Sequence, residues 1–544
     1  MNTKILLSAA SALDLDREAR ENWGLNEFAL VEAAGRSCGE CLVRACPELW
    51  RDSIPKVVAM VGPGNNGADA MVMLRYLLLT GRALPENSAV VINRIPSKKD
   101  LNPRSESFRV LKMMKLPILV WDGDLGEAFG RPSEDILAHA DLVIDGISGT
   151  GLKGSLEGKP IEMVNALNAQ RILKPPRRIG TPFKRRRPFV VSLDVPSGNS
   201  DSWLAGMPIV EADATLAIEP QKSCLYNPAA RPYGGTILPV EGIFPQELIR
   251  NYGGIELIDW DMIKHRIPRI NPDAYKYERG TVEIHAGSPG STGAAGIAAR
   301  GAQAAGAGMV LLMADEDIYP VLASRIGGVM VIPAGKEPAA GRLPDALLMG
   351  PGWGRDPKRA AALERALELE KAGIPLVLDA DGIYLARDRV FHGNAILTPH
   401  PGEFSVYAGI PVDQALTHPK ELLIKLAREK KAVIVLKSHV IIVAAPDGRI
   451  GVLDGMSPGL AAGGTGDLLA GFCAAIMGRL KSMNKRSGSD FDGYIAALTA
   501  AALLIAVGKS GEITSRFTDP MELADRAADL AGQAWLSSGR DMGL

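Results

Sequence analysis

Three polar, glycine-rich segments in the first half of the chain could bind an anion, hold a cation or move a proton. The first is Gly62-Pro63-Gly64-Asn65-Asn66-Gly67-Ala68-Asp69, which fits the spacing GxGxxG. Glycines at this spacing let backbone N–H groups approach a pyrophosphate at a helix N-terminus. A dinucleotide-binding site also needs an acid ~20 residues later to bind the ribose, and the expected strand there ends without one. The segment predicts a polar ligand site, and a tight turn without ligand is the structural alternative.

The other two segments also follow expected strands. They are Asp145-Gly146-Ile147-Ser148-Gly149-Thr150-Gly151 and Leu193-Asp194-Val195-Pro196-Ser197-Gly198. The carboxyl ends of parallel strands meet at one edge of a sheet, where open α/β folds bind ligands. Oxygens from Asn66, Asp145 and Ser197 suit an alkali or alkaline-earth cation. Asp194 could serve as a general base if it is removed from water.

A glycine-rich turn in the second half has different chemistry. It reads Ala462-Gly463-Gly464-Thr465-Gly466-Asp467 and opens onto an apolar run typical of a helix. Such a turn directs free N–H groups and the positive end of the helix dipole at an anion. Asp467 lies in the first turn, where it could accept a proton from a hydroxyl that faces a transferring phosphate. A glycine-rich contact between helices is the structural alternative.

Further segments of the second half lie at the ends of expected strands. They are 287–295, 350–354, 378–381 and 398–403, and the last contains His400 between prolines. A lone histidine is more often packed or solvated than functional. His400 is a candidate because its loop belongs to the same expected sheet edge.

Short apolar runs alternate with helical patterns in both halves. Strands are expected at 57–61, 89–93, 117–121, 142–145 and 189–194, and then at 281–286, 309–313, 347–349, 376–379, 395–397 and 433–436. Helices are expected at 465–479 and 494–507. This alternation predicts mostly parallel sheets covered by helices on both faces. Glycines and prolines at 251–275 predict a linker between domains 1–250 and 276–544.

Composition excludes several classes of protein. The chain has 544 residues, 61 Lys+Arg against 62 Asp+Glu, and 5% aromatic residues. Balanced charge and few aromatics disfavour a nucleic-acid partner. The basic stretch 171–188 is expected to be a solvated insertion, with a docking loop as the alternative. No apolar run reaches the ~18–20 residues of a membrane span.

The cysteines and the N-terminus bear on location. Five cysteines are too few for a disulfide framework and indicate a reducing compartment. Cys38 and Cys41 lie in an expected helix at 28–46, so we expect them to pack and not to bind metal. Acidic residues from Asp14 onward interrupt any signal-peptide pattern. We expect a cytoplasmic protein.

The first half resembles the epimerase domain of bifunctional NAD(P)H-hydrate repair enzymes. The resemblance covers 6–244 and rests on Asn-Asn-Gly-x-Asp, Asp-x-x-x-Gly-Thr-Gly-Leu and Leu-Asp-x-Pro-Ser-Gly. It implies interconversion of R and S NAD(P)H hydrated at nicotinamide C6, with Asp194 as acid/base and K⁺ on Asn66, Asp145 and Ser197. It implies substrate contacts from Asn65, Asn66, Gly67, Ala68, Asp69, Gly149, Thr150, Gly151, Leu152, Lys153, Gly154, Ser155 and Asp194.

The second half, over 276–535, resembles the ADP-dependent NAD(P)H-hydrate dehydratase of the same family. That resemblance implies that ADP phosphorylates the C6 hydroxyl, giving AMP, and that phosphate is then eliminated. Asp467 would activate the hydroxyl, Mg²⁺ would assist, and Asp379 and Glu403 would help. Substrate would contact Ala294, Gly354, His400 and Asp467. The adenine nucleotide would contact Lys437, Ser438, His439, Val440, Ile441 and Gly466.

The resemblances imply an α/β fold class, with a Rossmann-like three-layer domain followed by a ribokinase-like domain. The expected partners are NADHX or NADPHX, ADP and further copies of the chain in a homo-oligomer. The chain departs from the family pattern at Ala68, Ala70, Ser148 and Ser438. A positive φ at Ala68 would cost ~1 kcal/mol relative to glycine.

Two alternatives are open from the sequence. One is a ribokinase-like small-molecule kinase whose N-terminal domain binds a ligand without catalysis. The other makes that domain an interaction module that docks through 171–187.

Overall fold

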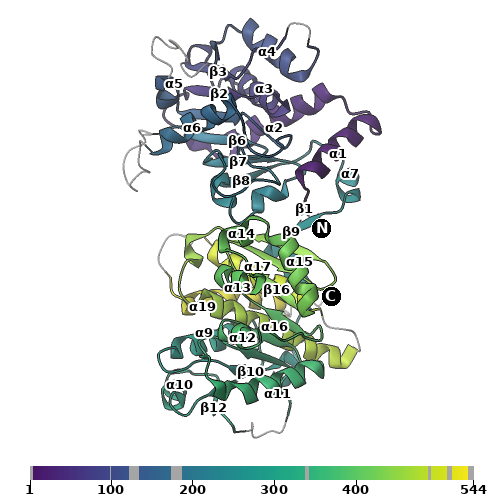
Figure 1. The fold of residues 1–544 in the computed structure, drawn as a ribbon, viewed down its shortest axis with the longest axis vertical. Coiled ribbons are helices and arrows are strands. Elements are labelled where there is room, and N and C mark those ends of the chain that lie inside the picture. The colour runs from purple at the N-terminus through teal and green to yellow at the C-terminus, as the bar shows by residue number, and fades with distance from the viewer. Residues whose placement is uncertain are drawn as a thin grey trace. The chain divides into compact units, whose positions relative to one another are not determined.

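The computed structural model describes residues 4–97, 100–121, 134–172, 187–336, 342–487, 492–510 and 518–536. The described chain divides into two compact units at Ile255 and Glu256, and Lys4 groups with the second unit. Figure 1 shows each unit as a sheet flanked by helices. Among the described residues, no helix is long and apolar enough to cross a membrane.

The sheet of the N-terminal unit is parallel throughout and has the order β4-β3-β2-β5-β6-β7-β8. Its central strands are continuous apolar runs, as expected for strands buried on both faces. The strands are β2 (Val57–Val61), β3 (Ser88–Ile92), β4 (Ile118–Val120), β5 (Leu142–Gly146), β6 (Phe189–Leu193), β7 (Ala214–Ile218) and β8 (Thr236–Val240).

Two separate cores show that this unit has three layers. Alternate residues of a strand point to opposite faces, and Val57, Ala59 and Val61 pack under α2, α3 and α4. Val58 and Met60 pack on the other face under α5 and α6. The helices are α1 (Ala9–Glu21), α2 (Glu27–Ala45), α3 (Asn65–Leu79), α4 (Pro103–Met113), α5 (Glu134–His139), α6 (Lys159–Ile172) and α7 (Gln246–Asn251), with 3₁₀ turns at Pro47–Trp50, Pro85–Asn87, Ser223–Tyr226 and Arg231–Gly234.

The C-terminal unit has a mixed sheet in the order β9-β18-β17-β16-β15-β14-β13-β10-β11-β12, and β1 (Lys4–Leu6) is the edge strand next to β9. From β16 to β12 all pairs are parallel, whereas β16, β17 and β18 form antiparallel hairpins. The strands are β9 (Ile255–Leu257), β10 (Thr281–His285), β11 (Met309–Ala314), β12 (Met330–Pro333), β13 (Ala346–Met349), β14 (Leu376–Leu378), β15 (Ala395–Leu397), β16 (Val433–Leu436), β17 (Val440–Ala444) and β18 (Ile450–Asp454).

The main core of this unit joins one face of the sheet to α9, α16, α17 and α19. Glycine allows the close packing of α9 on α16, because a Cβ on Gly471 would lie 2.3 Å from the Ala298 carbonyl oxygen. The helices are α8 (Trp260–Ile263), α9 (Thr292–Ala304), α10 (Tyr319–Arg325), α11 (Ala360–Lys371), α12 (Asp381–Leu385), α13 (Pro401–Ala408), α14 (Val412–Thr417), α15 (Pro419–Lys430), α16 (Thr465–Ser487), α17 (Gly493–Gly508) and α19 (Pro520–Trp535), with 3₁₀ turns at Lys264–Arg266, Lys276–Arg279, Pro357–Arg359 and Pro458–Leu460.

The segment 251–275, expected as a linker, carries structure of its own. It contains the last residue of α7, then β9, α8 and a 3₁₀ turn, and β9 pairs in parallel with β18. Trp260 packs edge-on against Trp535, with ring centroids 5.7 Å apart. The prediction of an α/β chain with parallel sheets is confirmed.

Candidate functional site

The first glycine segment forms the turn between β2 and α3. Gly62 has to be glycine because a Cβ there would lie 1.7 Å from the Ile147 carbonyl oxygen. The Gly62 N–H donates to the Gly146 carbonyl over 3.0 Å, which joins the turns after β2 and β5. Gly64 is the N-cap of α3, and Asn65 and Asn66 are its first residues. The sequence therefore brings two polar turns together at the carboxyl edge of the sheet.

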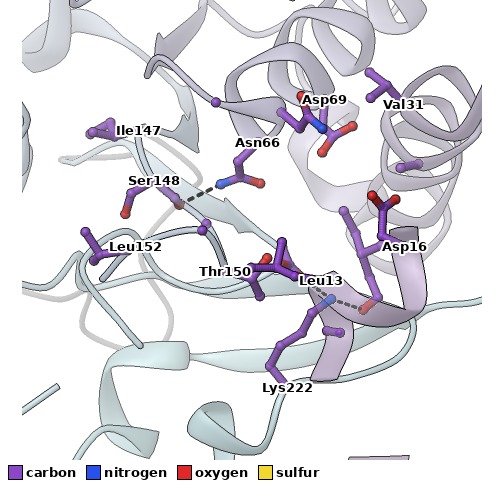
Figure 2. Close-up of a pocket in the computed structure, with 18 of the residues that line it drawn as sticks. Leu13, Asp16, Val31, Asn66, Asp69, Ile147, Ser148, Thr150, Leu152 and Lys222 are labelled. Carbon is purple, nitrogen blue, oxygen red and sulfur yellow. Dashed lines mark hydrogen bonds and ion pairs between the residues drawn. The ribbon is translucent and has the colours of Figure 1, made fainter. Parts of the chain in front are cut away.

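A pocket of about 680 Å³ opens at this edge. Most of the predicted contact residues line it, namely Asn65, Asn66, Asp69, Gly149, Thr150, Gly151, Leu152, Lys153, Ser155 and Asp194. Figure 2 shows Asn66, Asp69 and Thr150 around it, with Leu13 and Asp16 of α1. Within the described chain, Gly67, Ala68 and Gly154 lie outside the lining of this pocket.

The alanines that depart from the family pattern lie inside α3. Ala68 is fully buried against Val31 and Val72, in a helical conformation. Ala70 is also fully buried, and a Cβ on Gly146 would lie 2.6 Å from the Ala70 Cβ. The strain considered for Ala68 is therefore absent in this described helix, and neither methyl group narrows the pocket.

The residues predicted to hold a cation do come together. Asp145 is fully buried and accepts hydrogen bonds from Ser197 Oγ at 2.5 Å and Ser192 Oγ at 2.7 Å. Asn66 Nδ2 donates to the Ser148 carbonyl over 2.7 Å, and Ser197 Oγ also contacts that carbonyl at 3.1 Å. Burial raises the pKa of Asp145, and its hydrogen bonds from Ser197 oppose that shift.

One buried oxygen in this group fits a cation. Asn66 Oδ1 is buried and accepts no hydrogen bond from any described residue. A buried polar atom without a partner costs free energy, and an amide oxygen is a suitable ligand for a hard cation. Ser148 links the turns: its N–H donates to Ser197 Oγ over 2.8 Å and its Oγ accepts from the Gly198 N–H over 2.9 Å.

Asp194 lies in a strained turn directly after β6. Its φ is +62°, and the Val195 N–H donates to the Leu193 carbonyl over 2.7 Å, which makes a γ-turn with a positive φ at its centre. Non-glycine residues in this region concentrate at functional sites. The turn places the carboxylate 2.5 Å from the Lys222 Nζ, with both side chains buried. Figure 2 shows Lys222 facing the pocket from the segment after β7.

Asp69 is the second buried carboxyl group in the pocket. Burial raises the pKa of Asp69 well above its ordinary value, and the charge of Asp194 raises it further. Its Oδ1 is buried and has no hydrogen-bond partner among the described residues.

The turn before α16 forms the corresponding feature of the C-terminal unit. Gly464 has a φ of +97°, and a Cβ there would lie 2.6 Å from Ile297 Cδ1, so glycine meets both a conformational and a steric requirement. Asp467 stands in the first turn of α16. Burial raises the pKa of Asp467 to about 7, with a smaller contribution from the charge of Asp379, and Lys437 opposes the shift.

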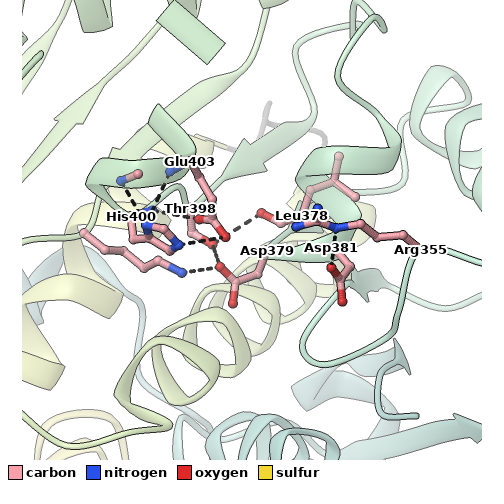
Figure 3. Close-up of polar contacts among 9 residues, drawn as sticks. Arg355, Leu378, Asp379, Asp381, Thr398, His400 and Glu403 are labelled. Carbon is pink, nitrogen blue, oxygen red and sulfur yellow. Dashed lines mark hydrogen bonds and ion pairs between the residues drawn. The ribbon is translucent and has the colours of Figure 1, made fainter. Parts of the chain in front are cut away.

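Asp379 and Lys437 form a buried ion pair beside Asp467. Thr398 Oγ1 also donates to Asp379 Oδ1 over 2.8 Å, which fixes the carboxylate (Figure 3). Lys437 reaches the glycine turn, since its Nζ lies 3.3 Å from where a Cβ on Gly466 would stand. The pair therefore joins the ends of β14 and β16 to the start of α16.

His400, Gly354 and Ala294 are the other residues of the C-terminal unit that were predicted to contact the substrate. His400 is the N-cap of α13, and its Nδ1 accepts from the N–H groups of Gly402 and Glu403 at 3.0 and 3.3 Å. Its Nε2 is 3.4 Å from Glu403 Oε1. Figure 3 shows the His400 and Glu403 side chains facing each other. The Gly354 N–H donates to Asp381 over 2.8 Å. A Cβ on Gly352 would lie 2.9 Å from the Ala294 Cβ, so Ala294 packs against this glycine.

The predicted nucleotide segment divides in two. Lys437, Ser438 and His439 form the turn between β16 and β17, and Ser438 Oγ accepts from the Val440 N–H over 3.1 Å. The Ser438 side chain therefore hydrogen-bonds within its own turn. The side chains of Val440 and Ile441 are buried in β17, an inner strand of the sheet.

Two other predictions concern residues outside these sites. Cys38 and Cys41 are free and buried in α2, which confirms that they pack. In the described part of the chain, no three His, Cys, Asp or Glu residues form a metal cluster. Arg171 and Arg187 both pair with Asp213, and most of the basic stretch, 173–186, lies outside the described residues.

Sequence reasoning missed Lys222 and Asp16 as pocket residues. Neither residue belongs to a sequence motif with a chemical role. Lys222 could have been identified from its position just after β7, but that strand was not predicted. The chain has a parallel sheet with a buried carboxylate–lysine pair at its edge and a mixed sheet with a glycine turn before an aspartate. Together they define a two-site α/β enzyme.

Comparison with known proteins gives the family. Residues 27–224 match the family described as "YjeF-related protein N-terminus", and residues 282–514 match "NAD(P)H-hydrate dehydratase". The bifunctional NAD(P)H-hydrate repair enzymes of Moorella thermoacetica and Gloeobacter violaceus are 30% and 31% identical over 87% and 84% of this chain, which are 88% and 86% of theirs. The chain belongs to the family of bifunctional NAD(P)H-hydrate repair enzymes.

A solved structure is similar to about half of this chain. It is an ADP/ATP-dependent NAD(P)H-hydrate dehydratase from Bacillus subtilis, 25% identical, with a TM-score of 0.44, covering 51% of this chain and 99% of that one.

Proposed function

We propose that this chain repairs hydrated NAD(P)H in two steps. The domain at 1–250 interconverts the R and S epimers of NADHX and NADPHX, and the domain at 276–544 dehydrates the S epimer with ADP, giving AMP and phosphate. Residues 251–275 connect them. The observation that carries the proposal is Asp467, half-buried at the glycine turn of α16 beside the Asp379–Lys437 pair.

The dehydratase chemistry follows from that placement. The C6 hydroxyl is a poor leaving group, so its phosphorylation prepares it to leave. Asp467 takes the hydroxyl proton as the oxygen attacks the β-phosphorus of ADP, and AMP departs. Loss of phosphate from C6 and of a proton from C5 then restores the ring double bond. The free N–H groups at Gly466 and the ammonium of Lys437 stabilise the charge on the transferring group.

Mg²⁺ would supply further charge neutralisation for the nucleotide. It commonly keeps several waters and binds through one or two carboxylates and the substrate phosphates. The described residues fit that mode: Asp379 and Asp467 are neighbours, and no third acidic or histidine ligand lies with them in the described chain.

In the epimerase pocket, Asp194 would take and return the proton of the C6 hydroxyl. A K⁺ ion would fit beside Asn66, Asp145 and Ser197, because the buried Asn66 Oδ1 has no described partner. The ion would supply positive charge near the phosphate-bearing part of the substrate. The turns at Gly64 and Gly149 to Ser155 would hold the rest of the dinucleotide.

All five cysteines are buried, and five in 544 residues are too few for a disulfide framework, which supports a reducing compartment, so we place the protein in the cytoplasm. The expected homo-oligomer is a prediction that light scattering of the purified chain can test.

The test uses the purified full chain, mixed-epimer NADH hydrate, Mg²⁺ and K⁺, with NADH absorbance as the readout. We expect complete NADH recovery that requires ADP. Recovery that stops at the S-epimer fraction would contradict the epimerase. Failure with both ADP and ATP would overturn the repair function, and ATP-dependent phosphorylation of a stable alcohol would favour a small-molecule kinase.

A further inference from the structure

Four buried ionisable side chains line the epimerase pocket, namely Asp69, Asp194, Glu219 and Lys222, and the family resemblance gives a proton-transfer role to Asp194 alone. Asp69, Asp194 and Lys222 are 8%, 6% and 5% exposed. They come from α3, from the turn after β6 and from the segment after β7, and all three line the pocket. Their side chains therefore meet at one end of the pocket from three different elements.

The position of Lys222 is fixed from several directions. Its Nζ lies 2.5 Å from Asp194 Oδ1 and donates to the Ile218 carbonyl over 3.0 Å. Its backbone is held in a bridge to Leu7, with the Leu7 N–H donating to the Gln221 carbonyl and the Ser223 N–H donating to the Leu7 carbonyl. The ammonium cannot follow a mobile ligand, so it acts on the carboxylate that it already contacts.

Charge counting separates the two carboxyl groups. One buried ammonium balances one buried carboxylate, and a second carboxylate in the same pocket would be disfavoured by burial and by repulsion. Lys222 contacts Asp194 directly, so the negative charge belongs on Asp194. Consistently, burial and the charge of Asp194 raise the pKa of Asp69 well above its ordinary value. Asp69 is therefore the group that keeps a proton.

Other charged groups around the pocket do not change this balance. Asp16 of α1 has its pKa raised by burial, with Arg20 opposing and Glu27 adding to the shift. The thiol of Cys38 in α2 also has its pKa raised by burial, so it stays neutral. Glu219 is held by the N–H groups of Ile243, Phe244 and the Gln246 side chain.

We propose that Lys222 is a positioning residue that holds Asp194 as the charged base, and that Asp69 is a second catalytic residue, the acid of the epimerisation. This assignment rests on the proposed function. Asp194 takes the proton from the C6 hydroxyl while the C6–N1 bond breaks, its electron pair passes to N1, and Asp69 gives N1 its proton. The open form is an aldehyde at C6 and an amine at N1.

The reverse steps complete the reaction. Rotation about the C5–C6 bond presents the other face of the aldehyde to N1, the C6–N1 bond forms again, and the proton of N1 returns to Asp69. Asp194 returns its proton to the oxygen. No oxidant, reductant or further reactant enters, and the enzyme regains its starting protonation.

The test compares Lys222→Met, Lys222→Arg and Asp69→Asn with the wild type in the full chain. We expect Lys222→Met to lower the kcat of epimerisation ~100-fold at pH 7, the scale of one acid–base contribution, with KM within about threefold. Lys222→Arg should recover much of the rate.

Two controls keep the test informative. Lys112→Met makes the same chemical change at an exposed lysine of the same unit and should keep the wild-type kcat and KM of epimerisation. Dehydration of purified S epimer with ADP reports the fold of each variant. In the infrared spectrum, the wild type at pH 7 should show a protonated carboxyl band that Asp69→Asn removes.

Several outcomes would overturn the assignment. An unchanged kcat in Lys222→Met, or no recovery of the rate in Lys222→Arg, would remove Lys222 from the positioning role, and a rise in KM alone would make it a substrate ligand. Absence of the Asp69-dependent infrared band would remove the neutral acid. If the wild-type protein fails to epimerise, the proposed function itself is refuted. Results on the Lys222 and Asp69 variants test only the roles of these two residues.

Discussion

Asp467 combines a raised pKa with a position at an anion-binding turn, and this sets the pH dependence of dehydration. A base works when deprotonated, and burial puts the pKa of Asp467 at about 7. We therefore expect kcat with ADP and S epimer to fall about tenfold per pH unit below 7 and to level off above it. Lys437→Met should shift this limb to higher pH, because Lys437 lowers the pKa of Asp467. A profile flat from pH 5 to 8 would contradict Asp467 as the base.

The same pKa predicts a cost to stability. Because the folded-state pKa of Asp467 is raised, folding favours its protonated form, and the free energy of unfolding contributed by this group falls as pH rises from about 4 to about 7. Asp467→Asn should therefore raise the melting temperature of the C-terminal unit at pH 8 and have little effect at pH 4. Calorimetry at both pH values measures these melting temperatures. If Asp467→Asn changes the melting temperature equally at pH 4 and pH 8, the change comes from packing and not from the titration of Asp467.

At the scale of elements, the turn between β2 and α3 offers a matched pair of glycines. A methyl group on Gly62 would overlap the Ile147 carbonyl, whereas one on Gly64 meets no described atom within 4 Å and faces the pocket. Gly62→Ala should destabilise the N-terminal unit by several kcal/mol, the range of severe overpacking. Gly64→Ala should keep the melting temperature and slow epimerisation. Melting curves and epimerisation rates distinguish them, and similar melting temperatures would contradict the steric argument.

The elements also show what sequence reasoning can reach. Each strand that was expected from the sequence lies within a residue or two of its predicted bounds, because continuous apolar runs such as 57–61 are typical of buried strands in an α/β chain. Seven strands were missed, namely β1, β7, β8, β9, β12, β17 and β18. Most of them are very short or contain glycine, proline or alanine, which weakens the strand pattern, whereas β17 is a continuous apolar run that was considered only as part of the nucleotide segment. The positions of the loop sites could be predicted, because the carboxyl ends of parallel strands lie at one edge of their sheet. The ion pair between Asp194 and Lys222 could not be predicted, because it depends on a γ-turn and on β7.

At the scale of the whole molecule, the two sites have separate cores and share no described side chain, so single substitutions should separate the activities. With mixed-epimer NADH hydrate and ADP, Asp194→Asn should stop NADH recovery at the S fraction, followed by slow spontaneous epimerisation. Asp467→Asn should yield no NADH and still equilibrate the epimers, as seen by chromatography. The two variants mixed in solution should together restore full recovery, because the S epimer released by one can be used by the other. If Asp194→Asn instead recovers all the NADH at the wild-type rate, the N-terminal unit binds a ligand without catalysis, and the kinase-like site alone accounts for the chemistry.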